Sequence, residues 1–281
     1  MLGPGGQDAT ARRPPVVPVT GDLRDFGLLS PGTRYPPAVP SVDRRTLLSA
    51  IAVGVLAAST APRAAGDPLR PPSSRRVPAP TGLLTRLPGG GRQVAFTVDD
   101  GTSTEVVAAF AQFCRDTGTR ITFFVNGVNA SWTANARALR PMVDSGQVQL
   151  GNHTWSHPYL TKISAREVAD QIRRNADFLT KTYGVDGTPF FRPPFGRHTV
   201  ISDKIAADLG YRTITTWTDQ VGDAKPTTEK DLVAGAARAF APGRIVLAHA
   251  NLPTITRCYG ELVDVIRARN LQTVTLNDVF R

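Results

Sequence analysis

Two adjacent carboxylates and two histidines are the side chains in this sequence best suited to hold a metal ion. Asp99 and Asp100 directly follow the apolar run 94–98, so a buried strand would deliver both carboxylates at its exit. His153 and His157 are four residues apart, a spacing that places both imidazoles on one face of a helical turn. An aspartate from another strand end would complete three protein ligands and leave a fourth position for water. For each motif taken alone, a polar turn is the competing interpretation.

Two further motifs also follow short apolar runs. Residues 192–196, with the sequence RPPFG, come after Phe190-Phe191. Their prolines exclude a helix, which suits a loop that presents Arg192 and a backbone N–H in a set direction. His249 ends the apolar run 245–248, where it would act as a general acid if it reached the metal pocket. A simple proline turn and a core histidine bonded to backbone are the alternatives.

Short apolar runs that alternate with amphipathic stretches predict the elements that position these residues. Strands alternating with helices imply right-handed βα units and a mainly parallel sheet. About 190 residues is slightly short for eight such units, so we expect an α/β fold with a distorted or shortened (β/α) barrel. Ligands then bind where the carboxyl ends of strands converge, and each motif above follows an apolar run. The expected strands are 94–98, 121–125, 148–150, 213–216, 245–247 and 273–274, and the expected helices are 104–117, 165–183, 201–209, 230–241 and 259–269.

Taken together, the four motifs resemble those of the polysaccharide deacetylases, carbohydrate esterase family 4, also called the NodB homology domain. The similarity covers about residues 91–281. It rests on TVDDG at 97–101, HTWSH at 153–157, RPPFG at 192–196 and LAH at 247–249, and TFFVNG at 122–127 is similar to the family's second strand. The resemblance implies a NodB-like distorted barrel and a hydrolase acting on carbon–nitrogen amide bonds.

The resemblance also implies a role for each matched side chain. A divalent metal, usually zinc, with Co²⁺ as another candidate, would be held by Asp100, His153 and His157. Asp99 would be the general base, and Arg192 would orient it and hold it ionised. His249 would be the general acid that protonates the departing amine.

Two further matched residues would contact the acetyl group. The resemblance implies that Leu247 lines the pocket for the acetyl methyl. The backbone N–H of Phe195 would help to stabilise the oxyanion. Family members often have tyrosine at this position, but a backbone donor does not depend on the missing hydroxyl.

One region departs from the family pattern. The family commonly shows Asp-x-x-Asp-Trp, in which an aspartate tunes the acidic histidine and the tryptophan walls the substrate groove. In the corresponding stretch here, the resemblance implies that Asp223 would keep the tuning role, but Gln220 and Ala224 replace the usual aspartate and tryptophan. We therefore expect a wider or differently shaped groove, with Trp217 among the residues that contact substrate.

Composition divides the 281 residues into a basic front third and an ordinary remainder. Residues 1–90 hold 15 of the 23 prolines, no lysine and +6 of the formal net charge of +10. Because the rest of the chain has an ordinary charge balance, we expect no nucleic-acid partner. Two cysteines exclude a disulfide scaffold. Cys114 and Cys258 would be able to pair in an exported protein, and the sequence leaves that pairing open.

The front third predicts export and tethering. Residues 1–41 lack a sustained apolar period, and we expect them to be disordered. In 42–65, Arg44-Arg45 precede an uncharged run of 16 residues, which resembles a twin-arginine export signal and is short of the roughly 20 that span a bilayer. An uncleaved anchor and a mis-set start site are the alternatives. The Pro- and Arg-rich stretch 66–90 predicts a linker that holds the domain 91–281 at a membrane or cell wall.

These features predict an exported, metal-dependent enzyme that removes N-acetyl groups from a cell-wall or extracellular polysaccharide of the N-acetylglucosamine type, such as peptidoglycan or chitin. A carbohydrate O-acetyl esterase or a non-sugar amidase on the same fold is one alternative, because the stretch 217–224 departs from the family. A non-catalytic wall-binding module is another, although such a module would need neither Asp99 nor His249.

Overall fold

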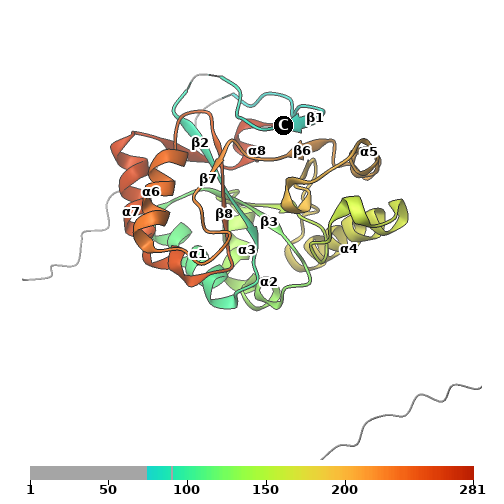
Figure 1. Ribbon diagram of the computed structural model, residues 1–281, viewed down its shortest axis with the longest axis horizontal. Helices are drawn as coiled ribbons and strands as arrows, with labels where there is room; N and C mark the ends of the chain where they lie inside the picture. Colours follow the sequence, from blue (N-terminus) through green and yellow to red (C-terminus); the bar gives the residue numbers. More distant parts are fainter. Residues whose placement is uncertain (1–74, 90) are drawn as a thin grey trace, which may run out of the picture. The chain divides into compact units, whose positions relative to one another are not determined.

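A parallel sheet forms the centre of the computed structural model, which describes residues 75–89 and 91–281 (Figure 1). Neighbouring strands follow the order β1-β6-β5-β4-β3-β2-β8-β7, and β9 pairs with the first residues of β2. Every pair of these strands is parallel, as the alternation of strands and helices predicts. The strands are β1 (Gly82–Leu84), β2 (Gln93–Asp100), β3 (Ile121–Val125), β4 (Val148–Asn152), β5 (Phe190–Phe191), β6 (Thr213–Thr215), β7 (Asp219–Gln220), β8 (Ile245–His249) and β9 (Gln272–Val274).

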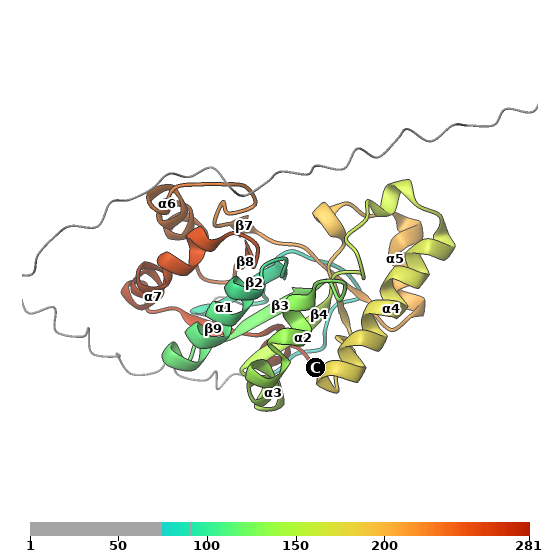
Figure 2. The same ribbon diagram turned by 90° about the horizontal axis from the view of Figure 1, so that it is seen from below.

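The longer helices lie on the outside of the curled sheet, with α6 and α7 toward one end of the strand row and α4 and α5 toward the other (Figures 1 and 2). The strand order starts at β1 and stops at β7 without closing into a ring. The expected distorted, shortened (β/α) barrel is therefore confirmed. The helices are α1 (Thr104–Thr117), α2 (Ala130–Ala134), α3 (Ala136–Asp144), α4 (Ala165–Tyr183), α5 (Val200–Asp208), α6 (Glu229–Ala239), α7 (Tyr259–Ala268) and α8 (Leu276–Val279), with short 3-10 turns η1 (Leu160–Lys162), η2 (Pro194–Gly196) and η3 (Pro253–Arg257).

The helices α1 and α4 begin and end where the sequence predicts because their terminal residues have strong capping chemistry. The side chain of Ser103 accepts a hydrogen bond from the first turn of α1, and Gly118 ends that helix with a φ of 70°. A capping box between Ser164 and Glu167 starts α4. These caps satisfy backbone groups that the helix itself leaves without partners.

Alternation along β2 determines which side chains face the candidate site. Val94, Phe96 and Val98 pack into the core between the sheet and the helices. Ala95 belongs to a second cluster, which fills the inside of the curl together with residues such as Ile245. Since side chains alternate along a strand, the odd-numbered series continues on this inner face through Thr97 to Asp99. Asp99 therefore enters the inside of the curl at the carboxyl end of its strand.

The folded part begins before residue 91, which corrects the expected linker over 66–90. β1 pairs in parallel with β6, and Leu84 and Leu87 are buried. The surrounding prolines favour an extended chain, but an extended chain with buried leucines also forms an edge strand. The stretches predicted as disordered (1–41) and as an export signal (42–65), together with 66–74, lie outside the described residues.

The remaining differences concern short elements. The sequence does not predict α2, α8, β5 or β7, which are too short for hydrophobic periodicity to reveal them, nor α3, which contains a proline at position 141. All the expected strands and helices are present, and their ends agree with the expected ones to within two residues. Within the described part of the chain, no helix is both long and apolar enough to cross a membrane.

Candidate active site

Asp99 and Arg192 form a buried ion pair at the carboxyl end of β2. Arg192 Nη1 donates hydrogen bonds to Asp99 Oδ1 at 2.7 Å and to Thr97 Oγ1 at 2.8 Å. Its other nitrogens donate to the carbonyl oxygens of Thr215 and Thr216. Arg192 is completely buried, and burial lowers its pKa while the carboxylate of Asp99 opposes that shift. With its remaining donors bonded to carbonyls, the guanidinium neutralises Asp99 and fixes that carboxylate in place.

The backbone of Asp100 is held in an unusual conformation. Its φ is 69°, in the left-handed region that side chains rarely adopt. The carbonyl oxygen of Asp100 accepts hydrogen bonds from Trp132 Nε1 at 2.9 Å and Asn129 Nδ2 at 3.0 Å. Gly101 follows with a φ of 81°, and a Cβ at that position would lie 2.5 Å from the Trp132 ring. The turn redirects Asp100, which would otherwise point away from Asp99 as the next residue of a strand.

His153 and His157 lie in a loop after β4, which corrects the expected helical turn. Residues 153–157 contain no helix, and both Thr154 and His157 have positive φ values, of 70° and 59°. Asn126 Nδ2 holds the loop by donating to the carbonyl oxygens of His153 and Thr154. The two imidazole centroids are 4.9 Å apart. Two left-handed residues thus bring the rings together as a helical turn would.

The tautomer of His153 follows from its hydrogen bond. Its Nδ1 lies 2.6 Å from the carbonyl oxygen of Arg192. Because a carbonyl only accepts hydrogen bonds, Nδ1 is the donor, and Nε2 is the ring nitrogen that a metal ion would bind. Nε2 lies 3.5 Å from Asp100 Oδ1 and 3.6 Å from Asp99 Oδ2.

Asp100, His153 and His157 fit a divalent metal ion. One ligand atom from each lies within 4.8 Å of the others. His157 Nε2 is 3.4 Å from Asp100 Oδ1. That oxygen is buried and has no hydrogen-bond partner, which is costly for a carboxylate unless a cation faces it. Two imidazole nitrogens and one carboxylate oxygen are a donor set typical of zinc.

The electrostatics of the cluster favour its metal-binding protonation state. Burial opposes ionisation of Asp100, but His153, His157 and a hydrogen bond from Asn251 outweigh it and hold the pKa of Asp100 well below its ordinary value. Burial and the neighbouring His153 lower the pKa of His157 to about 4. At neutral pH these shifts give an ionised carboxylate and a neutral imidazole at His157, as metal ligation requires.

His249 and Asp223 form a second pair beside the cluster. His249 Nδ1 lies 2.9 Å from Asp223 Oδ1, and the backbone N–H of His249 donates to Asp223 Oδ2 at 2.8 Å. Burial disfavours the imidazolium, but the hydrogen bond to Asp223 and the charges of Asp99, Asp223 and Asp100 outweigh it and raise the pKa of His249. His249 is also the register partner of Asp99 on the neighbouring strand. The candidate acid and the candidate base therefore lie side by side.

Three residues expected to contact substrate lie around this centre. Leu247 is buried on β8, two residues before His249 and so on the same face of the strand. Phe195 has a φ of 59° in η2, is 46% exposed, and its ring centroid lies 4.4 Å from that of His157. Trp217 is half-buried, and its ring lies beneath Gly196, where a Cβ would come within 3.0 Å of it.

Two residues near the site are absent from the sequence expectations. Tyr159 stacks on Phe195 with the ring centroids 3.9 Å apart and the planes 9° from parallel. Asn251 Nδ2 donates to Asp100 Oδ2 at 2.8 Å. Tyr159 follows His157 by two residues, and Asn251 follows His249 by two residues. Proximity to these histidines is the signal in the sequence that would have placed them near the site.

The other titratable candidates lie elsewhere. His198 Nδ1 is 2.8 Å from Asp203 Oδ2 at the start of α5. Cys114 and Cys258 are both buried and unbonded to each other. The disulfide that the sequence leaves open is therefore not formed in this structure.

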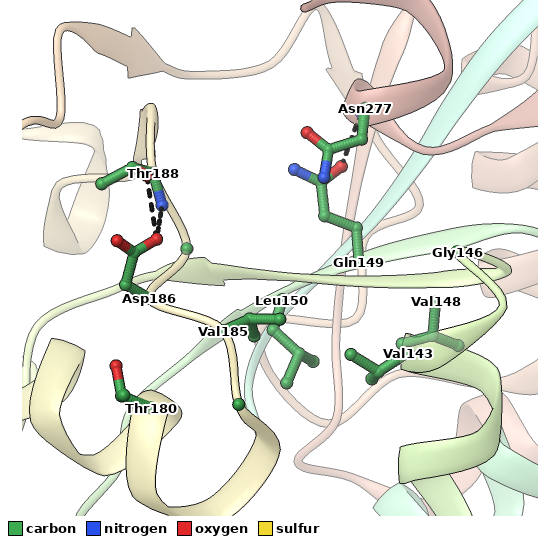
Figure 3. A pocket seen from close by; sticks show the side chains of 12 residues that line it. Val143, Gly146, Val148, Gln149, Leu150, Thr180, Val185, Asp186, Thr188 and Asn277 are labelled. Carbon is green, nitrogen blue, oxygen red and sulfur yellow. Dashed lines mark hydrogen bonds between the residues drawn. The ribbon is translucent and has the colours of Figure 1, made fainter.

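A separate cavity of about 430 Å³ lies at the opposite end of the strands (Figure 3). It is lined by the first residues of β4, including Gln149, by the end of α4 and by residues 184–188 ahead of β5. The candidate active site lies at the carboxyl ends of the strands, where ligands of parallel α/β folds bind. This cavity is therefore distinct from it.

Comparisons with known proteins agree with this geometry. Residues 86–214 match the model of the polysaccharide deacetylase family. The chain is 26% identical over 193 residues to a peptidoglycan-N-acetylglucosamine deacetylase of Bacillus cereus, which covers 67% of this chain and 68% of that protein. It is 29% identical over 238 residues to a chitin deacetylase of Colletotrichum lindemuthianum, and the match covers 79% of this chain and 92% of that protein. It spans only 42% and 38% of two longer relatives from Listeria monocytogenes and Bacillus subtilis.

Solved structures share the fold. A peptidoglycan N-acetylglucosamine deacetylase in complex with a benzamide ligand matches with a TM-score of 0.64 at 24% identity, over 71% of this chain and 92% of that one. A pseudoenzyme of carbohydrate esterase family 4 from Bacillus anthracis matches with a TM-score of 0.62 at 22% identity, over 70% of this chain and 68% of that one. Because a pseudoenzyme has this fold too, the fold alone does not establish activity. Over residues 86–214 the chain is therefore similar to the polysaccharide deacetylase family, and its fold is that of the carbohydrate esterase family 4 structures.

Proposed function

We propose that this protein is a metal-dependent hydrolase that removes N-acetyl groups from an N-acetylglucosamine-type polysaccharide. The observation that carries the proposal is the pairing of Asp99 with His249 across neighbouring strands, beside the Asp100, His153 and His157 cluster. A base and an acid at the carboxyl ends of two neighbouring strands, next to a metal site, supply each group that amide hydrolysis needs. The names of the relatives support peptidoglycan or a chitin-like polymer as the substrate.

Asp100, His153 and His157 would hold the metal, with zinc favoured by the donor set and Co²⁺ as an alternative. When bound, a divalent ion lowers the pKa of water and polarises an acyl carbonyl. The ionised Asp100 and the neutral His157 described above leave the ligand set with one negative charge. A dication in this site therefore keeps part of its charge for the substrate.

The chain's own groups would then move the protons. Asp99 accepts a proton from the attacking water, and the ion pair with Arg192 holds its carboxylate in position. The backbone N–H of Phe195 donates to the oxyanion as oxygen adds to the carbonyl carbon. His249, held through Nδ1 by Asp223, donates a proton to the amine nitrogen as the C–N bond breaks. The products are acetate and a free amine on the sugar.

A screen for released acetate tests the proposal. The full chain is incubated with chitooligosaccharides and peptidoglycan, with Zn²⁺ or Co²⁺ and with a chelator. We expect metal-dependent acetate release that falls at least a hundredfold in Asp99→Asn, while Asn135→Ala, away from the site, keeps wild-type activity. Full activity in Asp99→Asn contradicts the assigned base, and stoichiometric metal without turnover on any substrate supports a wall-binding module instead.

Altered residues at the groove support an O-acetyl esterase as the second candidate. Gln220 and Ala224 stand where the family usually has aspartate and tryptophan, and Gln220 is exposed. An alkoxide leaves more readily than an unprotonated amine nitrogen, which would depart as an amide anion, so ester hydrolysis depends less on protonation by His249. Parallel assays on O-acetylated and N-acetylated glycans separate the two activities.

We also propose that the enzyme acts outside the cytoplasm, because of the paired Arg44-Arg45 before an uncharged apolar run. Expression of the full chain followed by cell fractionation tests this. Replacement of both arginines by lysine is expected to retain the protein inside the cell. Unchanged export of that variant contradicts the twin-arginine interpretation.

A further inference from the structure

Asn251 joins the metal cluster to the loop that follows β8. Its Nδ2 donates to Asp100 Oδ2 at 2.8 Å. Its Oδ1 accepts two hydrogen bonds from Thr102, one from the backbone N–H at 3.0 Å and one from Oγ1 at 2.9 Å. These three hydrogen bonds all connect the amide to the segment that carries the aspartate of the proposed metal site.

The orientation of the amide is determined by the chemistry of its partners. The backbone N–H of Thr102 only donates, so the side-chain atom of Asn251 that faces it must be the oxygen. The nitrogen therefore faces Asp100, where a carboxylate only accepts. In a flipped amide, Nδ2 would face the backbone N–H of Thr102, so that two donors would meet. Oδ1 would face the carboxylate of Asp100, so that two acceptors would meet. One orientation is therefore strongly favoured.

This contact divides the two oxygens of Asp100 between different tasks. Oδ2 is occupied by Asn251, whereas Oδ1 has no hydrogen-bond partner and faces both His153 and His157. The backbone of Asp100 is already fixed by Trp132 Nε1 at its carbonyl oxygen. The remaining freedom is rotation of the carboxylate, which is the rotation that the amide restricts.

We propose that Asn251 is a positioning residue that sets the metal affinity of the site by presenting Asp100 Oδ1 to the ion. The inference rests on the proposed metal-dependent function and adds to it a residue outside the matched motifs. Hydrogen bonds to a ligating carboxylate typically change metal affinity about 10- to 100-fold when they are removed. A neutral donor is needed here, because a second carboxylate at position 251 would repel Asp100.

The role of Asn251 differs from that of a residue that only stabilises the fold. Asn135 is a suitable comparison, because its Nδ2 donates to the backbone carbonyls of Thr104 and Ser131 and touches no ligand. Loss of either amide removes hydrogen bonds from the fold. Only loss of Asn251 frees the carboxylate of a ligand.

Metal affinity tests the proposal without reference to turnover. The full chain is stripped of metal, and the Kd for Zn²⁺ is measured by competition with a chromophoric chelator for wild type, Asn251→Ala, Asn251→Asp, Thr102→Val and Asn135→Ala. The visible spectrum of the Co²⁺ form reports ligand geometry, and the Tm of the metal-free protein reports folding. We expect Asn251→Ala to weaken zinc binding about 10- to 100-fold and to alter the Co²⁺ spectrum. Asn251→Asp is expected to weaken zinc binding further. Thr102→Val is expected to weaken it less than Asn251→Ala does. Asn135→Ala is expected to keep the wild-type Kd.

Two results overturn the proposal. One is a Kd in Asn251→Ala within twofold of wild type while Asp100→Ala abolishes binding, which would leave the proposed function intact and show that Asn251 does not set affinity. The other is a wild-type protein that binds no zinc or cobalt, which removes the metal-dependent function and this role together. If Asn251→Ala lowers the metal-free Tm substantially, Thr102→Val decides, because it weakens the orientation of the amide and leaves Asn251 in place.

Discussion

The guanidinium of Arg192 lies 2.7 Å from the carboxylate of Asp99, and no part of the arginine reaches solvent. The two charges are far apart in the sequence, and their side chains meet inside the curl of the sheet. Removing one partner of such a pair leaves the other charged and buried, which typically costs about 3–5 kcal/mol.

Arg192→Met is therefore expected to lower the free energy of unfolding by about 3–5 kcal/mol, as measured by urea denaturation. The double variant Asp99→Asn with Arg192→Met is expected to recover part of that loss, because no unpaired charge remains. Arg120→Met is the matched control, since Arg120 forms a partly exposed ion pair with Asp278 away from the site. It is expected to cost less and to leave activity per folded molecule unchanged. An equal loss in the single and double variants would contradict the ion-pair account.

Asp223→Asn is expected to shift the pH profile. Asp223 raises the pKa of His249, so the imidazole stays protonated at a higher pH than an ordinary histidine with a pKa of 6.5. Without that carboxylate the pKa falls, and the protonated fraction at neutral pH falls with it. The decline of kcat/KM on the alkaline side should therefore begin at a lower pH.

The same shift has a consequence for stability. A raised folded-state pKa contributes stability that is fully present below the unfolded pKa and is lost as pH rises through the folded value. The stability difference between wild type and Asp223→Asn should thus be larger at pH 5 than at pH 9, as measured by thermal unfolding. A difference that grows with pH would contradict the assignment.

His153→Ala is expected to abolish stoichiometric zinc binding, because it removes one of three ligands and leaves Asp100 Oδ1 with a single imidazole. His198→Ala is the control, since His198 pairs with Asp203 outside the cluster. Metal content after dialysis, measured by atomic emission, distinguishes the two variants. Equal zinc in both would rule out the cluster as the metal site.

Tyr159→Ala and Phe195→Ala are expected to weaken substrate binding. The two rings are stacked, 39% and 46% exposed, and next to His157, so they offer an apolar face to a sugar ring. Loss of one aromatic contact of about 1 kcal/mol corresponds to roughly a fivefold rise in KM. Phe195→Ala retains the backbone N–H, so kcat should change little. Leu83→Ala, at another exposed apolar position on β1, should leave KM unchanged.

A chain that starts at residue 91 is expected to be less stable than one that starts at residue 75. The shorter chain lacks β1, which pairs with β6, and the buried side chains of Leu84 and Leu87. Each buried leucine contributes about 1.5–3 kcal/mol, and the edge of β6 would be left open to aggregation. Urea denaturation and light scattering of the two proteins test this. Equal stability would show that β1 is dispensable.

The sequence predicts those parts of the fold that local chemistry determines. α1 and α4 have strong caps and regular apolar spacing, so their bounds follow from Ser103, Gly118 and Ser164. The strands β2, β3 and β8 are continuous apolar runs that end at polar residues. Asp99 and His249 therefore lie side by side at the carboxyl ends of β2 and β8, as the sequence predicts.

Parts determined by distant contacts could not be predicted. β1 is three residues long within a proline-rich stretch, and only its pairing with β6 makes it a strand. The spacing of His153 and His157 fits both a helical turn and the loop with two left-handed residues that the structure has. Asn251 contacts Thr102 across a separation of 149 residues, which no local pattern reveals.

The position of β2 between β3 and β8 determines when the candidate metal site becomes complete during protein synthesis. Asp100 precedes Asn251 by 151 residues, which a ribosome adds over about 8–30 s. His153 and His157 emerge about a third of the way through that interval, whereas Asn251 and the candidate acid His249 emerge at its end. The nascent chain thus carries the three candidate ligands before the amide that contacts one of them and before the candidate acid, so the proposed chemistry would have to wait until β8 has docked against β2.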